Sequence, residues 1–84
     1  MNTSKKIEKL IMEAVPSLPP NQKKVAEFFL ENMSLVALLP VKDIAKEAEV
    51  SQASIVRFAQ LLGFSGFKEL KDKISTKKKN QLSP

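Results

Sequence analysis

The sequence contains no cysteine, histidine, tryptophan or tyrosine, and glycine occurs only twice in its 84 residues. Without cysteine there is no disulfide and no thiolate metal site. The joint absence of cysteine and histidine also removes the common nucleophile–base pairs and most zinc chemistry. We therefore expect no metal, no cofactor and no enzymatic activity from this chain.

Long apolar runs are also missing. No segment approaches the roughly 18–20 apolar residues that a membrane-spanning helix needs. Glu8 and Glu13 interrupt the apolar part of the N-terminal stretch, which argues against a signal peptide. An apolar content of 43% nevertheless supports one folded domain. These features predict a soluble, cytoplasmic protein that does not interact with membranes.

The net charge of +5 is unevenly distributed along the chain. Residues 1–50 carry equal numbers of lysines and acids, so the whole excess lies in residues 51–84. A one-sided basic charge is typical of proteins that bind a polyanion such as nucleic acid. A solvated basic tail is the alternative, because Lys77, Lys78 and Lys79 are consecutive.

Apolar residues recur at helical spacing, which predicts an all-α bundle of five helices. Ser4, Ser51 and Ser65 are the expected N-caps, and Gly63 suits the left-handed position after a helix. A short helical turn is expected over 34–39, ending at Pro40. The helices are expected at about 4–15, 20–32, 41–48, 51–62 and from 65 onward. Residues 1–76 form the expected domain, and 77–84 lose periodicity and are typical of a linker.

Two of these segments, 41–48 and 51–62, are joined by a short turn and fit a helix-turn-helix motif of homeodomain-like type. The first helix needs a small residue where the helices cross, and Ala45 provides it. Glu49 departs from the motif, because glycine usually occupies this position and its backbone tends toward positive φ. The residues that match the motif's spacing are Ile44, Ala45, Ala48, Val50, Ile55 and Phe58.

On a helical wheel, Ile55, Ala59 and Leu62 share one face of the second helix, and Arg57 lies opposite. The major groove of B-DNA admits one α-helix, whose N-terminal residues contact base edges. The candidates for base contact are Gln52, Ala53, Ser54 and Arg57. Arg57 can instead hold a phosphate, or form a salt bridge with Glu31 or Asp43.

Polar and basic side chains around this helix are candidates for phosphate contact. Lys42 begins the first helix of the motif, where such motifs meet the DNA backbone. Ser51 is foremost an N-cap, and its backbone N–H can also meet a phosphate. For Lys68 and Lys71, solvent exposure is an equal alternative. The candidates are Lys42, Ser51, Gln60, Ser65, Lys68 and Lys71. Phe58, Phe64 and Phe67 are expected in the core, not in a base-stacking platform.

The segments "LPPNQKKVAEFFLEN" and "VKDIAKEAEVSQASIVRFAQLLGFSGFKELK" resemble the N-terminal domain of RpiR-type transcription regulators. The resemblance covers roughly residues 4–76 and is most specific from Ser51 to Leu70. It implies a bacterial regulator of sugar-metabolism genes that binds duplex DNA. It also supports Gln52, Ser54 and Arg57 at the groove, with Ser65 and Lys68 near the backbone.

Family members typically join this domain to a sugar-isomerase-type domain that senses a phosphosugar. That second domain is absent from this chain, which we expect to be an isolated DNA-binding domain without effector binding. A homodimer on a symmetric operator is expected, with the apolar stripe of the first helix as a candidate dimer contact. The alternative function is a helical bundle that binds another protein instead of DNA.

Overall fold

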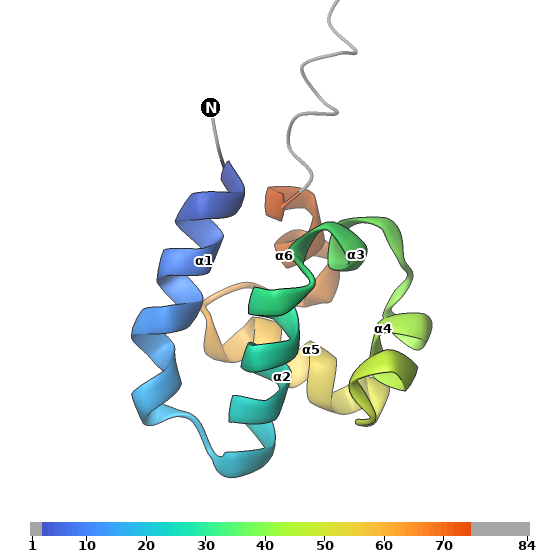
Figure 1. The fold of residues 1–84 in the computed structure, drawn as a ribbon, viewed down its shortest axis with the longest axis horizontal. Helices are drawn as coiled ribbons and strands as arrows, with labels where there is room; N and C mark the ends of the chain where they lie inside the picture. The colour runs from blue at the N-terminus through green and yellow to red at the C-terminus, as the bar shows by residue number, and fades with distance from the viewer. Residues whose placement is uncertain (1–2, 75–84) are drawn as a thin grey trace, which may run out of the picture.

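The computed structural model describes residues 3–74, with side chains from residue 5 onward. Within this part every regular element is helical, which confirms the all-α fold (Figure 1). The elements are α1 (Thr3–Ala14), a 3₁₀ turn (Val15–Ser17), α2 (Pro20–Glu31), α3 (Met33–Leu38), α4 (Val41–Ala48), α5 (Gln52–Leu61) and α6 (Phe67–Ile74). The expected linker at 77–84 lies outside the described residues.

The helix boundaries follow the prolines closely. Pro16 lies in the 3₁₀ turn that ends α1, and Pro20 is the first residue of α2, where its missing N–H costs nothing. The short turn expected before Pro40 is instead a complete helix, α3, so the described residues contain six α-helices and not five. Ser4 lies within α1, because that helix begins at Thr3, so it is not the N-cap.

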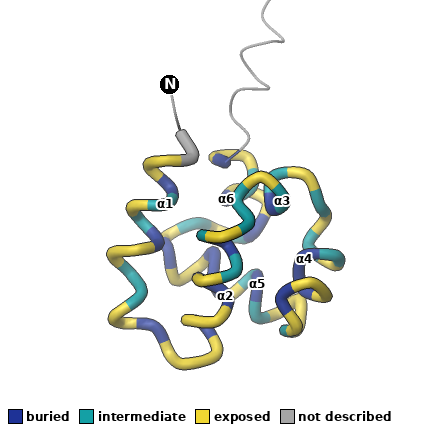
Figure 2. Tube along the Cα trace, in the orientation of Figure 1, coloured by how far each residue is buried: buried dark blue, intermediate teal, exposed yellow. Residues whose placement is uncertain are grey.

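The core lies between α2, α5 and α6 (Figures 1 and 2). Helix α1 packs against α2 and α6, and α4 packs against α2 and α5. Phe29 on α2 is fully buried, and its ring lies beside those of Phe58 and Phe67. Phe64 is partly buried against the same cluster. The three aromatic residues that the sequence assigns to the core therefore pack there, and none is available to stack on bases.

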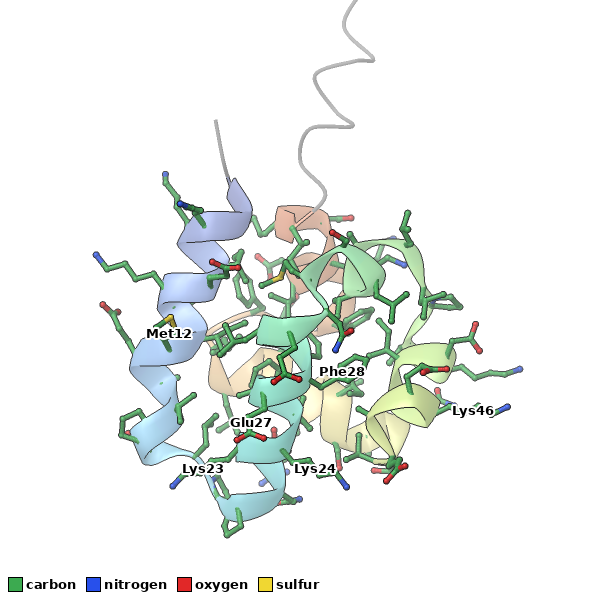
Figure 3. All side chains as sticks on the ribbon, viewed as in Figure 1. Met12, Lys23, Lys24, Glu27, Phe28 and Lys46 are labelled. Carbon is green, nitrogen blue, oxygen red and sulfur yellow. The ribbon has the colours of Figure 1, made fainter. Side chains whose placement is uncertain are left out.

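The apolar stripe of α1 is part of this core. Ile7 and Ile11 are buried, and α1 packs against α6 and α2. The buried part of the stripe is thus used within the domain, and the dimer contact at α1 stays a prediction. A contact through α1 would have to use its outer face, where Met12 is 61% exposed (Figure 3).

The turn between α4 and α5 has the geometry that the helix-turn-helix motif requires. Glu49 adopts φ 61° and ψ 44°, the left-handed conformation expected at this position. The N–H of Val50 donates to the carbonyl of Ala45 at 2.9 Å, and the N–H of Glu49 donates to that of Lys46 at 3.2 Å. These two bonds form a Schellman motif, which closes the C-terminus of α4.

The far end of α5 is closed in the same way. Gly63 has φ 101°, as expected for the glycine after this helix. Its N–H donates to the carbonyl of Gln60 at 3.0 Å, and the N–H of Phe64 donates to that of Ala59 at 3.0 Å. Tight turns therefore connect α5 to both of its chain neighbours, α4 and α6.

Candidate nucleic-acid interface

The first turn of α5 is built on Ser51. Its backbone is extended, with φ −77° and ψ 160°, and its Oγ accepts a hydrogen bond from the N–H of Ser54 at 3.1 Å. Ser51 is therefore the N-cap of α5, as predicted. The hydroxyls of Ser51 and Ser54 lie 3.0 Å apart, and Ser54 is half-buried. The Ser54 side chain is thus directed at the cap and not into solvent.

The side of α5 turned away from the core is open. We call Gln52, Ala53, Arg57 and Gln60 the outer face of α5; all four are exposed. The opposite side carries Ile55, Phe58 and Ala59, which are fully buried. Small and polar side chains at the front of an exposed helix allow close approach to a groove floor.

Arg57 is the single charged residue of this outer face. Among residues 5–74, no carboxylate lies within 4.0 Å of its guanidinium, so neither Glu31 nor Asp43 forms the salt bridge considered above. The guanidinium is exposed and carries five N–H donors. Such a group can form a bidentate pair with guanine or hold a phosphate.

The lysines expected to contact phosphates differ in whether they already bind another residue of the domain. Lys42, at the start of α4, and Lys68, at the start of α6, are exposed. Lys71 is half-buried, and its Nζ donates to the carbonyl of Leu39 at 2.7 Å. This bond joins α6 to the end of α3. Lys71 therefore has a structural partner that its position in the sequence did not reveal.

Ser65 is also engaged within the domain. Its backbone N–H and its Oγ both donate to Glu69 Oε1, at 2.8 and 3.0 Å. These two bonds lower the pKa of the exposed Glu69 carboxyl, and Lys73 adds to the effect. Because α6 begins at Phe67, Ser65 lies two residues before the helix and is not its N-cap. The Ser65 N–H already faces an anion, the carboxylate of Glu69.

The structure adds basic residues that the sequence analysis did not single out. Lys23 and Lys24 in the first half of α2 and Lys46 on α4 are exposed and project away from the domain (Figure 3). The first turn of α2 lies against the first turn of α5, because Gln22 Nε2 donates to the Ser54 carbonyl at 3.3 Å. Residues 1–50 have no net charge because acids balance these lysines, so the charge distribution along the sequence did not indicate them.

The arrangement is thus an N-capped helix with an open outer face, and exposed lysines lie on α2 and α4, two helices that pack against it. The chain matches the model of the helix-turn-helix domain of the rpiR family over residues 5–81. It belongs to this family. The fold and the helix-turn-helix geometry are those of the DNA-binding domain of a transcription regulator.

Two relatives are similar over most of the rpiR-type domain. An uncharacterized HTH-type transcriptional regulator of Caldanaerobacter subterraneus subsp. tengcongensis is 41% identical over 66 residues, which are 79% of this chain and 23% of that protein. Another from Haemophilus influenzae is 39% identical over 59 residues, 70% of this chain and 20% of that protein. The chain therefore spans less than a quarter of the length of these relatives.

A solved structure has the same fold. The crystal structure of the N-terminal domain of ybbH from Bacillus subtilis, described as a transcriptional regulator, superposes with a TM-score of 0.75. The two are 28% identical, and the match covers 81% of this chain and 83% of the other.

In residues 3–74, no helix is long and apolar enough to cross a bilayer. That part also has no cluster of three or more potential metal-ligating side chains.

Proposed function

We propose that this rpiR-type domain binds double-stranded DNA sequence-specifically, with α5 in the major groove. The exposed, unpaired Arg57 on the outer face of α5 is the observation that carries the proposal. Gln52 and Ala53 precede it on the same exposed side and can reach base edges. Ser54 lines the groove wall at most, because its hydroxyl is used beside Ser51.

The backbone contacts that we propose surround this helix. Lys42, Lys68 and Gln60 are exposed and free to meet phosphates, and the N–H groups after Ser51 can do the same. Ser65 and Lys71 are weaker members of the set, because each already has a partner within the domain. Ser65 would have to exchange Glu69 for a phosphate, and Lys71 has two further N–H donors to offer.

We further propose that the domain acts as the DNA-binding part of a homodimeric, cytoplasmic regulator of bacterial sugar-metabolism genes. A two-fold symmetric operator would then hold half-sites about 34–36 Å apart. A phosphosugar effector would act through a sugar-isomerase-type domain outside this chain. Sedimentation of the domain with and without operator tests the dimer, since two copies per operator are expected.

The DNA proposal is tested by fluorescence anisotropy with a duplex selected from a genomic library and with a random duplex. Arg57→Ala should weaken operator binding by about 1–3 kcal/mol and relax specificity at one position if the arginine contacts a base. Arg57→Lys should restore binding only if the contact is to a phosphate. Lys9→Ala on α1 is the charge-matched control, because Lys9 is exposed on another helix.

Equal binding by the Arg57 variants and the wild type would contradict the proposed orientation of α5. No binding of any duplex at low salt would favour the alternative function, a bundle that binds another protein. These two outcomes can be told apart, because in the first the domain still binds DNA and in the second it does not.

A further inference from the structure

Within residues 5–74, a single polar side chain lies in the otherwise apolar core. Gln22, in the first turn of α2, is 2% exposed. Its Nε2 donates to the backbone carbonyl of Ser54, 32 residues away in the first turn of α5. This is a direct hydrogen bond between α2 and the helix that carries the outer face.

The amide is costly for the stability of the core. Its Oε1 is buried and has no hydrogen-bond partner among residues 5–74. A buried polar atom without a partner is unfavourable, and one hydrogen bond through Nε2 offsets only part of the cost. An unbranched apolar side chain would fill the same volume without this penalty. The amide at Gln22 therefore does not serve stability alone.

The geometry of the bond indicates what it does instead. Apolar contacts between α2 and α5, such as Phe29 with Phe58, are not directional and tolerate small rotations of a helix. A hydrogen bond weakens steeply when its angle changes. The Ser54 carbonyl shares a turn with Gln52 and Ala53, and Arg57 begins the next. Holding that carbonyl fixes the direction in which these three side chains point.

We propose that Gln22 is a positioning residue for DNA recognition, which acts through the backbone of Ser54 to set the rotation of α5. The proposal rests on the proposed function, because the aligned side chains matter only if they meet DNA. Gln22 itself, being buried, does not contact DNA.

The decisive variant is Gln22→Met, which keeps the length and volume of the side chain and removes both the donor and the unpartnered oxygen. Thermal unfolding should occur at an equal or higher Tm. The ratio of affinities for the selected operator and a random duplex should fall about five-fold, the factor that one net hydrogen bond is worth. Binding to the random duplex should not change, because phosphate contacts carry it.

The control is Asn21→Ala, which removes an exposed amide from the same turn of α2. It should leave both Tm and the affinity ratio unchanged. An unchanged affinity ratio in Gln22→Met, with or without a lower Tm, would overturn the proposal, because a merely structural residue affects stability and not specificity.

Amide hydrogen exchange separates this proposal from the proposed function. If wild type binds no duplex, the proposed function fails, and exchange at residues 55–58 still tests the restraint on α5. These amides should exchange several-fold faster in Gln22→Met than in wild type, while the amides of α4 should not change. Equal exchange in α5 would show that Gln22 does not hold the helix.

Discussion

The ring centroids of Phe29 on α2 and Phe58 on α5 lie 4.8 Å apart, with the ring planes inclined at 57°. Phe29 also meets Phe67 on α6 edge-on, with centroids 6.4 Å apart and planes at 90°. One fully buried side chain therefore joins the three helices that form the centre of the domain. Such aromatic pairs stabilise beyond the apolar area that they bury.

Phe29→Ala should therefore destabilise the domain by about 3–5 kcal/mol, since it leaves a cavity between three helices. That loss approaches the whole stability expected for a domain of this size. Urea denaturation followed by far-UV circular dichroism measures it. Leu38→Ala on α3 is the control, because Leu38 is 77% exposed and its loss should change stability by less than about 0.5 kcal/mol.

Two substitutions of Ser51 distinguish its role as the N-cap of α5 from a role in DNA contact. Ser51→Ala should cost about 1 kcal/mol, because the N–H of Ser54 loses its side-chain acceptor. Ser51→Asp should retain stability, since aspartate is an equally good cap, but should weaken DNA binding because its charge repels phosphates. Thermal unfolding and anisotropy titration measure the two effects. Parallel losses of stability and affinity in both variants would contradict this separation.

Glu49 is in the left-handed region, which disfavours residues with a side chain. Glu49→Gly should stabilise the domain by about 0.5–1 kcal/mol, the left-handed penalty less the extra chain entropy of glycine. It also removes a negative charge from the C-terminus of α4. Glu47→Gly, two residues earlier within α4, should instead cost about 1 kcal/mol. The same sign for both variants in urea denaturation would be inconsistent with the turn described here.

Glu69 gives the domain a pH-dependent contact. Its pKa lies below the ordinary value of 4.5 because Ser65 donates two hydrogen bonds to the ionised carboxylate. The folded state thus favours the charged form, and this stabilisation is present above about pH 4.5 and lost as the pH falls through the folded pKa.

Glu69→Gln should therefore lower Tm at about pH 7 and lower it less at about pH 3, because the stabilisation from the charged form decreases as the carboxyl becomes protonated. Melting curves at the two pH values measure this difference. Glu27→Gln on α2 controls for charge alone, because Glu27 is exposed and its side chain has no hydrogen bond among the described residues. An equal Tm loss from Glu69→Gln at both pH values would rule out the carboxylate as the cause.

The salt dependence of the DNA affinity should report the number of phosphates that the domain contacts. Each phosphate neutralised contributes about 0.9 to the slope of log affinity against log salt. Lys42→Ala should reduce the slope by about this amount and weaken all sequences equally, because a phosphate contact carries no base information. Anisotropy titrations at several salt concentrations give the slope. Lys9→Ala on α1 should leave the slope unchanged, and a change there would place DNA elsewhere on the domain.

Local features of the domain could be predicted from the sequence. The N-cap at Ser51, the left-handed Glu49, the glycine turn at Gly63 and the buried face of α5 all depend on residues close together in the chain. They are therefore visible as spacing and residue type. The same holds for the exposure of Arg57.

Contacts between distant residues could not be predicted in this way. The bonds Gln22–Ser54 and Lys71–Leu39 each join residues 32 positions apart. A glutamine in an amphipathic helix is ordinarily exposed, so nothing in its neighbourhood marks Gln22 as buried. The sequence predicts only a short turn where α3 forms, because six residues are too few for a clear periodic pattern. Ser65 donates its hydrogen bonds to Glu69 in the first turn of α6, so a serine before a helix is not necessarily its N-cap.

The first turn of α1 and the last turn of α6 lie side by side, while the first turn of α2 and the α4–α5 connection lie at the opposite end (Figure 1). A fluorescent protein or affinity tag fused at either end of residues 3–74 would therefore be attached at the end of the domain opposite the α4–α5 connection. Under the proposed function, such fusions should immobilise or label the domain without obstructing the binding of a duplex at α5. The same placement should allow two domains to be tethered through these ends while both α5 helices stay accessible.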